Sequence, residues 1–270
     1  MVIGAKARCI TRRDAESRMN AGRAEAAFWA AFLHNRNVDA VTAGDGAVSV
    51  AGGYALFVGR TLIDHALGAG STRPLRADDC EVVESFYGAR GAAARFELDA
   101  DVLDRDQALF RSRGYADEGR ILAVLEGPTA AAAAAPGIAV RRTTDRRAWV
   151  ELIARAFDDA PDETFRQTLQ TNAAAAHVLV VASVDGGEAG GAALGIAGDT
   201  AILYSAAVLP AFRGRGVHAA LLVARLGLAS ARGAANAVFK TAPDSPAERS
   251  ALRHGFVRTS LRRRVRREAV

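Results

Sequence analysis

Hydrophobic and polar positions in the second half of the chain alternate between the period of a helix and that of a strand. Apolar side chains recur every three or four residues over 149–157, after Thr143 and Thr144 as candidate N-caps, which predicts a helix. A second short helix is predicted near Pro161. The later predicted elements are strands over 177–184, 192–196 and 201–208, a helix over 217–231, a strand over 237–240, a helix after 245 and a strand over 256–265.

The helix after residue 245 carries signals at both of its ends. Ser245 can accept a hydrogen bond as the N-cap, Pro246 suits the first helical position, and Glu248 completes a capping box. Gly255 stands where the chain leaves the helix, in a left-handed conformation that glycine adopts at little cost. The bounds of this helix are therefore predicted from local chemistry.

The first half shows a similar order of elements after a less regular beginning. A helix is predicted over 13–33, and two weak strands follow near Val48 and over 54–58. From residue 78 the pattern is clearer and predicts a helix to 87, a strand over 94–98, a helix to 113 and a strand over 121–125. Because the second half has the same order, including a Gly-aromatic pair before its last strand, we predict a diverged internal duplication.

A break in composition separates the two halves. Gly-Pro and Pro-Gly pairs bracket an alanine run between residues 127 and 137, and such a low-complexity stretch favours a linker. We therefore predict one domain over 1–127, a linker over 128–137 and a second domain over 138–270. Each half has the length of an ordinary domain.

Composition and charge exclude several classes of protein. With 50% hydrophobic and 24% charged residues, the chain has the balance of a globular protein. A net charge of +5 is modest for this length and does not indicate a nucleic-acid binder. No apolar stretch reaches the roughly 18 residues of a membrane span, and 26–33 is better explained as an amphipathic helix than as a secretory signal. Cys9 and Cys80 lack disulfide or zinc-site spacing, so we expect free thiols and a cytoplasmic location. No histidine has metal-ligand spacing, so we expect no metal.

The loop Arg213-Gly214-Arg215-Gly216-Val217-His218 carries the clearest chemical signal. It follows the strand that ends at Val208 and opens a helix. Backbone N–H groups at a helix N-terminus lack partners within the helix, and the helix dipole adds positive charge there, so the position favours an anion. The two glycines let a bulky diphosphate approach the backbone, and the two arginines add charge. The spacing excludes a P-loop, and the third glycine and the acidic residue of a dinucleotide-binding fold are missing.

This segment, V-x-P-x-x-R-G-x-G-x-x-A-x-L, resembles the acetyl-CoA motif of the GNAT acetyltransferase superfamily. The matching residues are Val208, Pro210, Arg213, Gly214, Gly216, Ala219 or Ala220, and Leu221. The element order from about 138 to 265 is also similar, including Gly255-Phe256 after the penultimate helix. The resemblance implies an α/β fold of mixed α+β type, with tandem GNAT-like domains, each a mostly antiparallel mixed sheet flanked by helices.

The first half resembles the degenerate GNAT-like domain of two-domain members. Its match is limited to Glu84-Ser85-Phe86-Tyr87 and Arg113-Gly114-Tyr115, and it has no R-G-x-G loop. The resemblance therefore implies that only the second domain holds coenzyme.

The resemblance also assigns residues to acetyl-CoA. The backbone at 207–209 would pair with the pantetheine arm, and 213–219 would wrap the diphosphate. His218 replaces the usual small residue, and three roles are open to it: it donates to a phosphate, it crowds the loop, or it is a first-turn histidine with no ligand role. The residues assigned in this way are Ala207, Val208, Leu209, Arg213, Gly214, Arg215, Gly216, Val217, His218 and Ala219.

The groups that would move protons are harder to identify. Many GNAT enzymes protonate the departing thiolate with a tyrosine four residues before the Gly-Phe pair, and that position is Ala251 here. Tyr204 and Ser250 are the remaining candidates, although Tyr204 is also explained as a buried tyrosine with a satisfied hydroxyl. The strand over 201–208 offers no carboxylate as base. An acidic cluster could attract a cationic acceptor or form a solvated loop; its members are Asp158, Asp159, Asp162 and Glu163.

The leading hypothesis is an acyltransferase that moves an acetyl or another small acyl group from acetyl-CoA to an amine of a small molecule or peptide. The alternative is a CoA-binding module without turnover, which senses acetyl-CoA or scaffolds a partner. A third hypothesis is a basic nucleic-acid-binding protein in which the R-G-R-G loop contacts phosphates. The arginine-rich tail over 258–267 lacks the interleaved aromatic residues that would favour nucleic-acid binding. The acceptor and the oligomeric state do not follow from the sequence.

Overall fold

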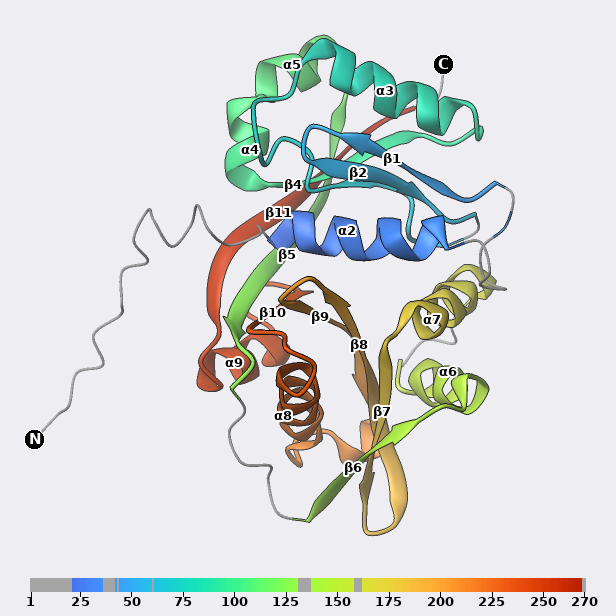
Figure 1. Cartoon of the computed structure of the whole chain (residues 1–270), viewed down its shortest axis with the longest axis vertical. Helices are drawn as coiled ribbons and strands as arrows, with labels where there is room; N and C mark the ends of the chain where they lie inside the picture. The colour runs from blue at the N-terminus through green and yellow to red at the C-terminus, as the bar shows by residue number, and fades with distance from the viewer. Residues whose placement is uncertain are drawn as a thin grey trace, which may run out of the picture.

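The computed structural model describes residues 21–35, 42, 44–59, 61–130, 137–157 and 162–268. Within these ranges the strands form one mixed sheet in the order β1-β2-β3-β4-β11-β5-β10-β9-β8-β7-β6, with helices packed on its faces (Figure 1). The predicted α/β architecture is confirmed. The structure adds that both halves of the chain contribute to the same sheet.

The first half follows the predicted order. The predicted strands at Val48 and 54–58 are present, and the predicted helix over 13–33 is present from 21, since its earlier residues lie outside the described part. The single helix predicted to end at 113 is instead two short helices, which Asp106 separates. The carboxylate of Asp106 accepts a hydrogen bond from the backbone of Leu75 (3.0 Å). The elements are α2 (Ala21–His34), β1 (Gly46–Val50), β2 (Gly53–Phe57), β3 (Ala66–Leu67), α3 (Ala77–Gly88), β4 (Ala94–Asp99), α4 (Ala100–Arg105), α5 (Gln107–Ser112) and β5 (Ala116–Pro128).

The second half contains one strand, β6, that the pattern did not predict. The N-cap of the following helix is Asp145, whose carboxylate accepts from the backbone of Ala148 (2.9 Å), instead of Thr143 or Thr144. The helix predicted near 161 is longer than expected. The elements are β6 (Ile138–Thr143), α6 (Arg146–Arg155), α7 (Glu163–Ala175), β7 (Val178–Val184), β8 (Gly187–Ala197), β9 (Thr200–Val208), η1 (Pro210–Phe212), α8 (Val217–Ser230), β10 (Asn236–Thr241), α9 (Pro246–Arg253) and β11 (Val257–Arg267).

The ends of α9 follow the predicted chemistry with one difference. Ser245 accepts a hydrogen bond from the backbone of Glu248 (3.2 Å), and Gly255 has a φ of +84°. The carboxylate of Glu248, however, accepts from the backbone of Asp244 instead of that of Ser245, and it also pairs with Arg258 (2.6 Å). The loop before the helix is therefore tied to β11.

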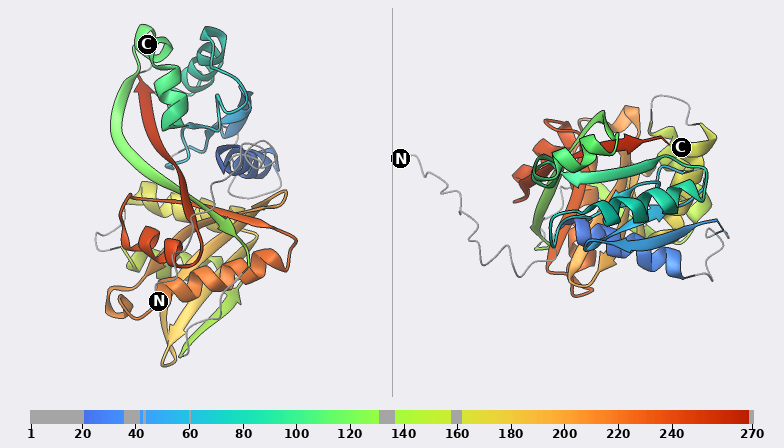
Figure 2. Two further views of the ribbon diagram at one scale, coloured as in Figure 1. Left: turned by 90° about the vertical axis from the view of Figure 1, so that its left-hand side faces the viewer. Right: turned by 90° about the horizontal axis from the view of Figure 1, so that it is seen from above.

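The last strand of each half pairs with strands of the other half. β5 lies between β10 and β11 and is antiparallel to both, while β11 is antiparallel to β4. Figure 2 shows these two long strands running side by side between the upper and lower parts of the molecule. The domain bounds 1–127 and 138–270 stay a prediction, but separating the halves would break the β5–β10 and β11–β4 ladders.

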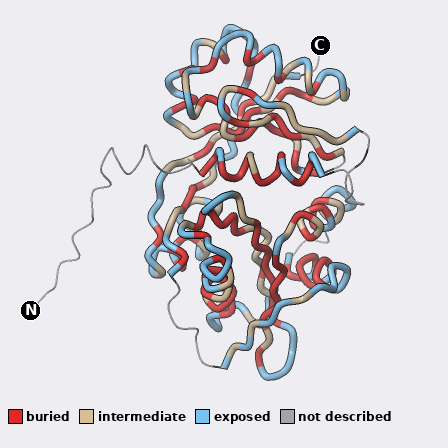
Figure 3. The backbone as a smooth tube through the Cα atoms, in the orientation of Figure 1, coloured by how far each residue is buried: buried red, intermediate tan, exposed pale blue. Residues whose placement is uncertain are grey.

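The core of the second half lies on both faces of its sheet. Val180 of β7 packs with α8 on one face, and Val181 packs with α6 and α7 on the other, so β7 is apolar except at Ser183. Helix α2 of the first half also lies against β8 and β9. Figure 3, in which the backbone is coloured by burial, shows α2 as a mostly buried helix across the middle of the molecule. Gly195 permits this contact, because a Cβ there would lie 2.4 Å from Cε2 of Phe28.

Candidate active site

The site begins where two parallel strands diverge. β9 and β10 pair only from Thr200↔Asn236 to Ile202↔Val238, so β9 has no β10 partner from Leu203 onward. β9 also carries a bulge, at which its register with β8 shifts and Ser205 takes a φ of +49°. The backbone edge of β9 is therefore open to another partner along the segment that contains 207–209.

A buried arginine lies beneath the bulge. Arg225 on α8 donates from Nε to the carbonyl of Leu221 (3.1 Å), and from Nη1 to the carbonyls of Ala193 (3.2 Å) and Tyr204 (3.5 Å). Burial lowers the pKa of Arg225 to about 9, and the described residues offer it no carboxylate within ion-pair distance. The guanidinium therefore joins the bulged part of β9 to β8.

The glycines of the R-G-R-G loop leave open space. Gly214 and Gly216 have φ values of +76° and +83°, in the left-handed region that favours glycine. No described atom of the chain lies within 4 Å of a Cβ built at Gly214, and Ile138 Cδ1 at 3.7 Å is the closest to one at Gly216. The loop precedes the N-terminus of α8, where backbone N–H groups lack helical partners. These features fit a diphosphate.

The two arginines of this loop contact the protein itself. Arg213 donates to the carbonyls of Val208 (3.3 Å) and Ala156 (2.7 Å), which ties the loop to the end of β9 and to the residue after α6. Arg215 pairs with exposed Asp185 (3.1 Å). An anion at this loop would therefore be bound mainly by the backbone N–H groups of the loop. The contacts of Arg213 and Arg215 with the protein fix the conformation of the loop.

His218, in the first turn of α8, is uncharged at neutral pH. Burial and nearby Arg225 lower the pKa of His218 to about 4. Its Nδ1 is buried and has no hydrogen-bond partner among the described residues. His218 therefore cannot supply a cation to a diphosphate near neutral pH, and its ring faces the cavity described next.

Two cavities lie at the divergence of β9 and β10. The α8-side cavity, of about 650 Å³, is bounded by β5, β9, β10 and α8. The α2-side cavity, of about 240 Å³, is bounded by α2, the 62–67 segment, α7, β9 and β10. The residues that line both are Leu203, Tyr204, Ser205, Phe239 and Lys240.

The α2-side cavity has mostly apolar walls, and the first half of the chain supplies many of them. Its apolar lining includes Trp29, Leu62, Ile63 and Ile202. The polar groups that line it are Glu25, His65, Thr168, Asn172, Tyr204, Ser205 and Lys240. Asn172 donates from Nδ2 to Ser205 Oγ (2.9 Å).

The predicted proton donors are not positioned for that role. The hydroxyl of Tyr204 donates to the carbonyl of Asn172 (3.1 Å), and burial raises the pKa of Tyr204. Ser250 is buried in α9 and lines neither cavity, while Ala251 packs in the core.

The two described members of the predicted acidic cluster, Asp162 and Glu163, serve α7 instead of the cavities. Asp162 caps α7 by accepting from the backbone of Phe165 (2.8 Å), and Glu163 accepts from Gln167 Nε2 (2.9 Å). Neither lines either cavity, and Asp158 and Asp159 lie outside the described residues.

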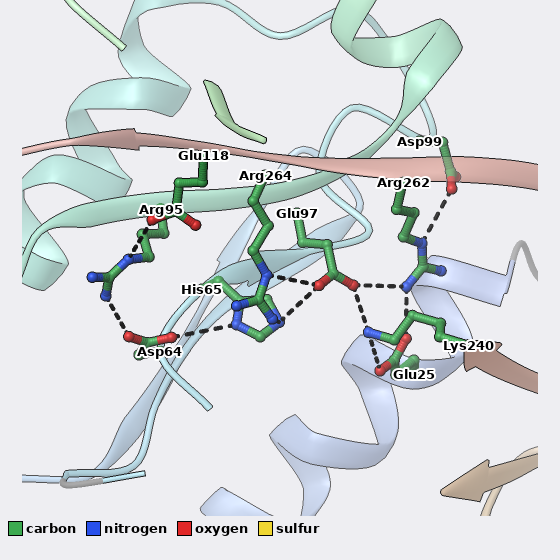
Figure 4. A network of polar contacts seen from close by, with 10 residues as sticks. All are labelled: Glu25, Asp64, His65, Arg95, Glu97, Asp99, Glu118, Lys240, Arg262 and Arg264. Carbon is green, nitrogen blue, oxygen red and sulfur yellow. Dashed lines mark hydrogen bonds and ion pairs between the residues drawn. The ribbon is translucent and has the colours of Figure 1, made fainter. Parts of the chain in front are cut away.

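A buried network of charges that the sequence analysis missed borders the α2-side cavity (Figure 4). Lys240 Nζ lies 2.7 Å from Glu25 Oε1 and 2.5 Å from Glu97 Oε1. Arg262 contacts Glu25 (2.7 Å), and Arg264 contacts Glu97 (2.9 Å). Burial alone would raise the pKa values of Glu25 and Glu97, but Lys240 and Arg262 hold both pKa values below the usual range.

A signal for this network was present in the sequence. The chain has two lysines, Lys6 and Lys240, and the second interrupts an apolar strand. Its partners Glu25 and Glu97 are more than 140 positions away in the sequence, so periodicity could not reveal the pairing.

The matching position in the first half is filled by the protein's own side chains. The loop between β3 and α3 contains two glycines, but a Cβ at Gly70 would lie 2.8 Å from Val102. At the N-terminus of α3 the carboxylate of Asp79 accepts from the backbone of Arg76 (2.8 Å) and pairs with Arg73 (2.6 Å). An internal carboxylate therefore occupies this helix N-terminus, which supports coenzyme binding by the second half alone.

Within the described ranges, no group of three or more His, Cys, Asp or Glu residues is placed to hold a metal ion. None of the helices in the described part of the chain is long and apolar enough to cross a membrane.

A mixed sheet that opens beside a glycine-rich loop and a helix N-terminus is the arrangement of a coenzyme-binding transferase domain. Residues 146–256 match the model of the acetyltransferase (GNAT) family, so this segment is a GNAT domain and the resemblance is confirmed. This relationship supports acyl transfer from coenzyme A. No curated protein sequence matches the chain.

Solved structures show the same fold at low sequence identity. A GCN5-related N-acetyltransferase from Kribbella flavida is 14% identical, with a TM-score of 0.59, over 82% of this chain and 89% of that one. A tandem GNAT protein from the clavulanic acid biosynthesis pathway is 15% identical, with a TM-score of 0.57, over 76% and 74%. A GCN5-related N-acetyltransferase from Sphaerobacter thermophilus is 21% identical, with a TM-score of 0.51, over 66% and 60%.

Proposed function

We propose that this protein is an N-acyltransferase that moves an acetyl or another small acyl group from coenzyme A to an amine. The observation that carries the proposal is the pair of cavities on either side of the β9–β10 divergence, which share five lining residues. A donor bound from the α8 side and an acceptor bound from the α2 side would meet there.

The donor would bind along the open edge of β9 and over the R-G-R-G loop. The backbone at 207–209 would pair with the pantetheine amides, and N–H groups of 213–219 would contact the diphosphate. The side chain of Val217, the first residue of α8, is buried in the core, and Ala219 is half-buried. These two residues would therefore contact the diphosphate through their backbone N–H groups.

The acceptor would be a small amine with an apolar body. Removing an ammonium from water into an apolar cavity lowers its pKa, so the α2-side cavity would favour the neutral amine that can attack. The amine nitrogen then forms a bond to the thioester carbon, the carbon–sulfur bond breaks, and the sulfur leaves with the electron pair. One proton leaves the nitrogen and one is delivered to the sulfur.

The alternative of a CoA-binding sensor without turnover rests on the placement of the expected proton donors. The hydroxyl of Tyr204 is committed to Asn172, and Ser250 and Ala251 lie away from the cavities. A sensor would bind CoA and transfer no acyl group.

Thermal stability and thiol release distinguish these functions. Acetyl-CoA and CoA should each raise the melting temperature, and a short DNA duplex should not. With acetyl-CoA and a panel of small apolar amines, free thiol should appear only when an amine is present. Stabilisation by DNA alone would refute coenzyme binding, and binding of CoA without thiol release over the whole panel would favour the sensor.

A further inference from the structure

Lys240 occupies the junction of the two cavities. It lies on β10 two residues after Val238, the last residue paired with β9. Its side chain is 18% exposed and lines both the α8-side and the α2-side cavity. An ammonium at this point would face the donor sulfur from one side and the acceptor nitrogen from the other.

Two carboxylates of the first half hold the side chain of Lys240 in place. Glu25 on α2 and Glu97 on β4 contact its Nζ at 2.7 and 2.5 Å. Around these carboxylates lie His65 and two arginines of β11, Arg262 and Arg264 (Figure 4). Arg120 of β5 lines the α8-side cavity. The ion pairs with Glu25 and Glu97 thus orient the Lys240 side chain, which also lines both cavities.

The other polar groups of the α8-side cavity are less suited to give up a proton to the sulfur. Tyr204 donates to a backbone carbonyl, and burial raises its pKa. Ser205 accepts a hydrogen bond from Asn172, His218 is uncharged, and Arg225 donates to three carbonyls.

We propose that Lys240 protonates the departing thiolate of coenzyme A, and that Glu25 accepts the proton lost by the amine. This inference rests on the proposed function. As the carbon–sulfur bond breaks, the sulfur takes its electron pair and one proton from the ammonium of Lys240. Glu25 takes one proton from the amine nitrogen and passes it to Lys240 across their 2.7 Å contact, so both side chains return to their starting charges. This relay replaces the tyrosine that is absent at Ala251.

The first test measures the thiol of bound CoA and requires no turnover. A cation beside the sulfur lowers the pKa of the thiol, by about one to three pH units for a close charge. The ultraviolet absorbance of the thiolate is followed during a pH titration of CoA with protein in excess, and the titration of protein alone is subtracted. Cys80 interferes little because burial raises its pKa to about 12.

The variants separate the expected contributions. Lys240→Met and Lys240→Gln should return the bound thiol to the pKa of free CoA, whereas Lys240→Arg should keep it low. Arg120→Gln is the matched control, because it removes another cation of the same cavity and should change the thiol pKa much less. Lys240→Gln retains polar contacts to both carboxylates and serves if Lys240→Met does not fold.

Turnover then separates proton transfer from charge alone. Lys240→Gln and Lys240→Arg should both lower kcat by about 100- to 10,000-fold, the usual contribution of general acid–base catalysis, with little change in the Kd for CoA. A bound thiol that titrates identically in wild type and Lys240→Gln would overturn the inference. If wild type itself binds no CoA, it is the proposed function that fails.

Discussion

The carboxylate of Glu25 and the ammonium of Lys240 lie 2.7 Å apart, although Glu25 is on a helix of the first half and Lys240 on a strand of the second. The contact lies at the wall of the α2-side cavity. In the proposed function, the first half would supply the wall of the acceptor cavity and the counter-charge of the proton donor, although it has no coenzyme loop.

The loop assignment is tested by Gly216→Glu, which should weaken CoA binding on the order of a hundredfold. The new carboxylate would occupy the space above the helix N-terminus and repel the diphosphate. Isothermal calorimetry measures the change. Gly233→Glu is the control, since Gly233 also has a positive φ (+84°) and open space around it but lies beyond the other end of α8. Equal CoA affinity in both variants would contradict the assignment.

The buried network should make a large contribution to stability that depends on all of its members. Glu25→Ala leaves Arg262 and Lys240 with fewer counter-charges in a buried site, so we expect a loss of about 3–5 kcal/mol in the free energy of unfolding. Glu188→Ala, which removes an exposed pair with Arg141, should cost less than about 1 kcal/mol. Urea denaturation provides both values, and similar losses would contradict the role of the network.

Acid should weaken the fold through Glu25 and Glu97. Their folded pKa values lie below the ordinary 4.5, so the stability they contribute is complete above that pH and is lost as the pH falls through the folded values. We expect the unfolding free energy of wild type to decrease below pH 4.5. In Glu25→Gln this decrease should be smaller, and an unchanged slope would show that Glu25 does not titrate in this way.

His218 should affect stability over a higher range of pH. Its pKa is 6.5 in the unfolded chain and about 4 in the fold, so the unfolded state binds the additional proton between these values. Stability is therefore complete above pH 6.5 and decreases by up to about 3 kcal/mol as the pH falls to about 4. The difference between wild type and His218→Gln, measured by denaturation from pH 4 to 7, should show this slope in wild type alone.

Acceptor specificity should depend on Leu62. This residue is 44% exposed and lines the α2-side cavity, so Leu62→Ala should raise the KM for an apolar amine on the order of tenfold. The Kd for CoA should not change. Leu252→Ala on α9 is the control, because Leu252 is similarly exposed (46%) and lines neither cavity. An effect on CoA instead of the amine would place the acceptor elsewhere.

Local chemistry in the sequence determined the loop and many element bounds. The left-handed backbone at positions 214 and 216 favours glycine, and Ser245 caps its helix by accepting a hydrogen bond from the backbone of nearby Glu248. Such interactions join residues a few positions apart, so spacing and residue type predict them. The predicted repeat of elements in the first half was also present in the fold.

Only the tertiary structure decided what those elements do together. The exchange of β5 and β11 between the halves depends on ladders between strands far apart in the chain. Only the fold shows that the hydroxyl of Tyr204 donates to the carbonyl of Asn172 and that Ser250 lines neither cavity, because tertiary surroundings decide where a hydroxyl points and what it bonds. Glu25 and Lys240 carried no local pattern, since burial and long-range pairing bring their charges together. The sequence by itself therefore predicted where a coenzyme would bind, and the fold decided which side chains lie around that position.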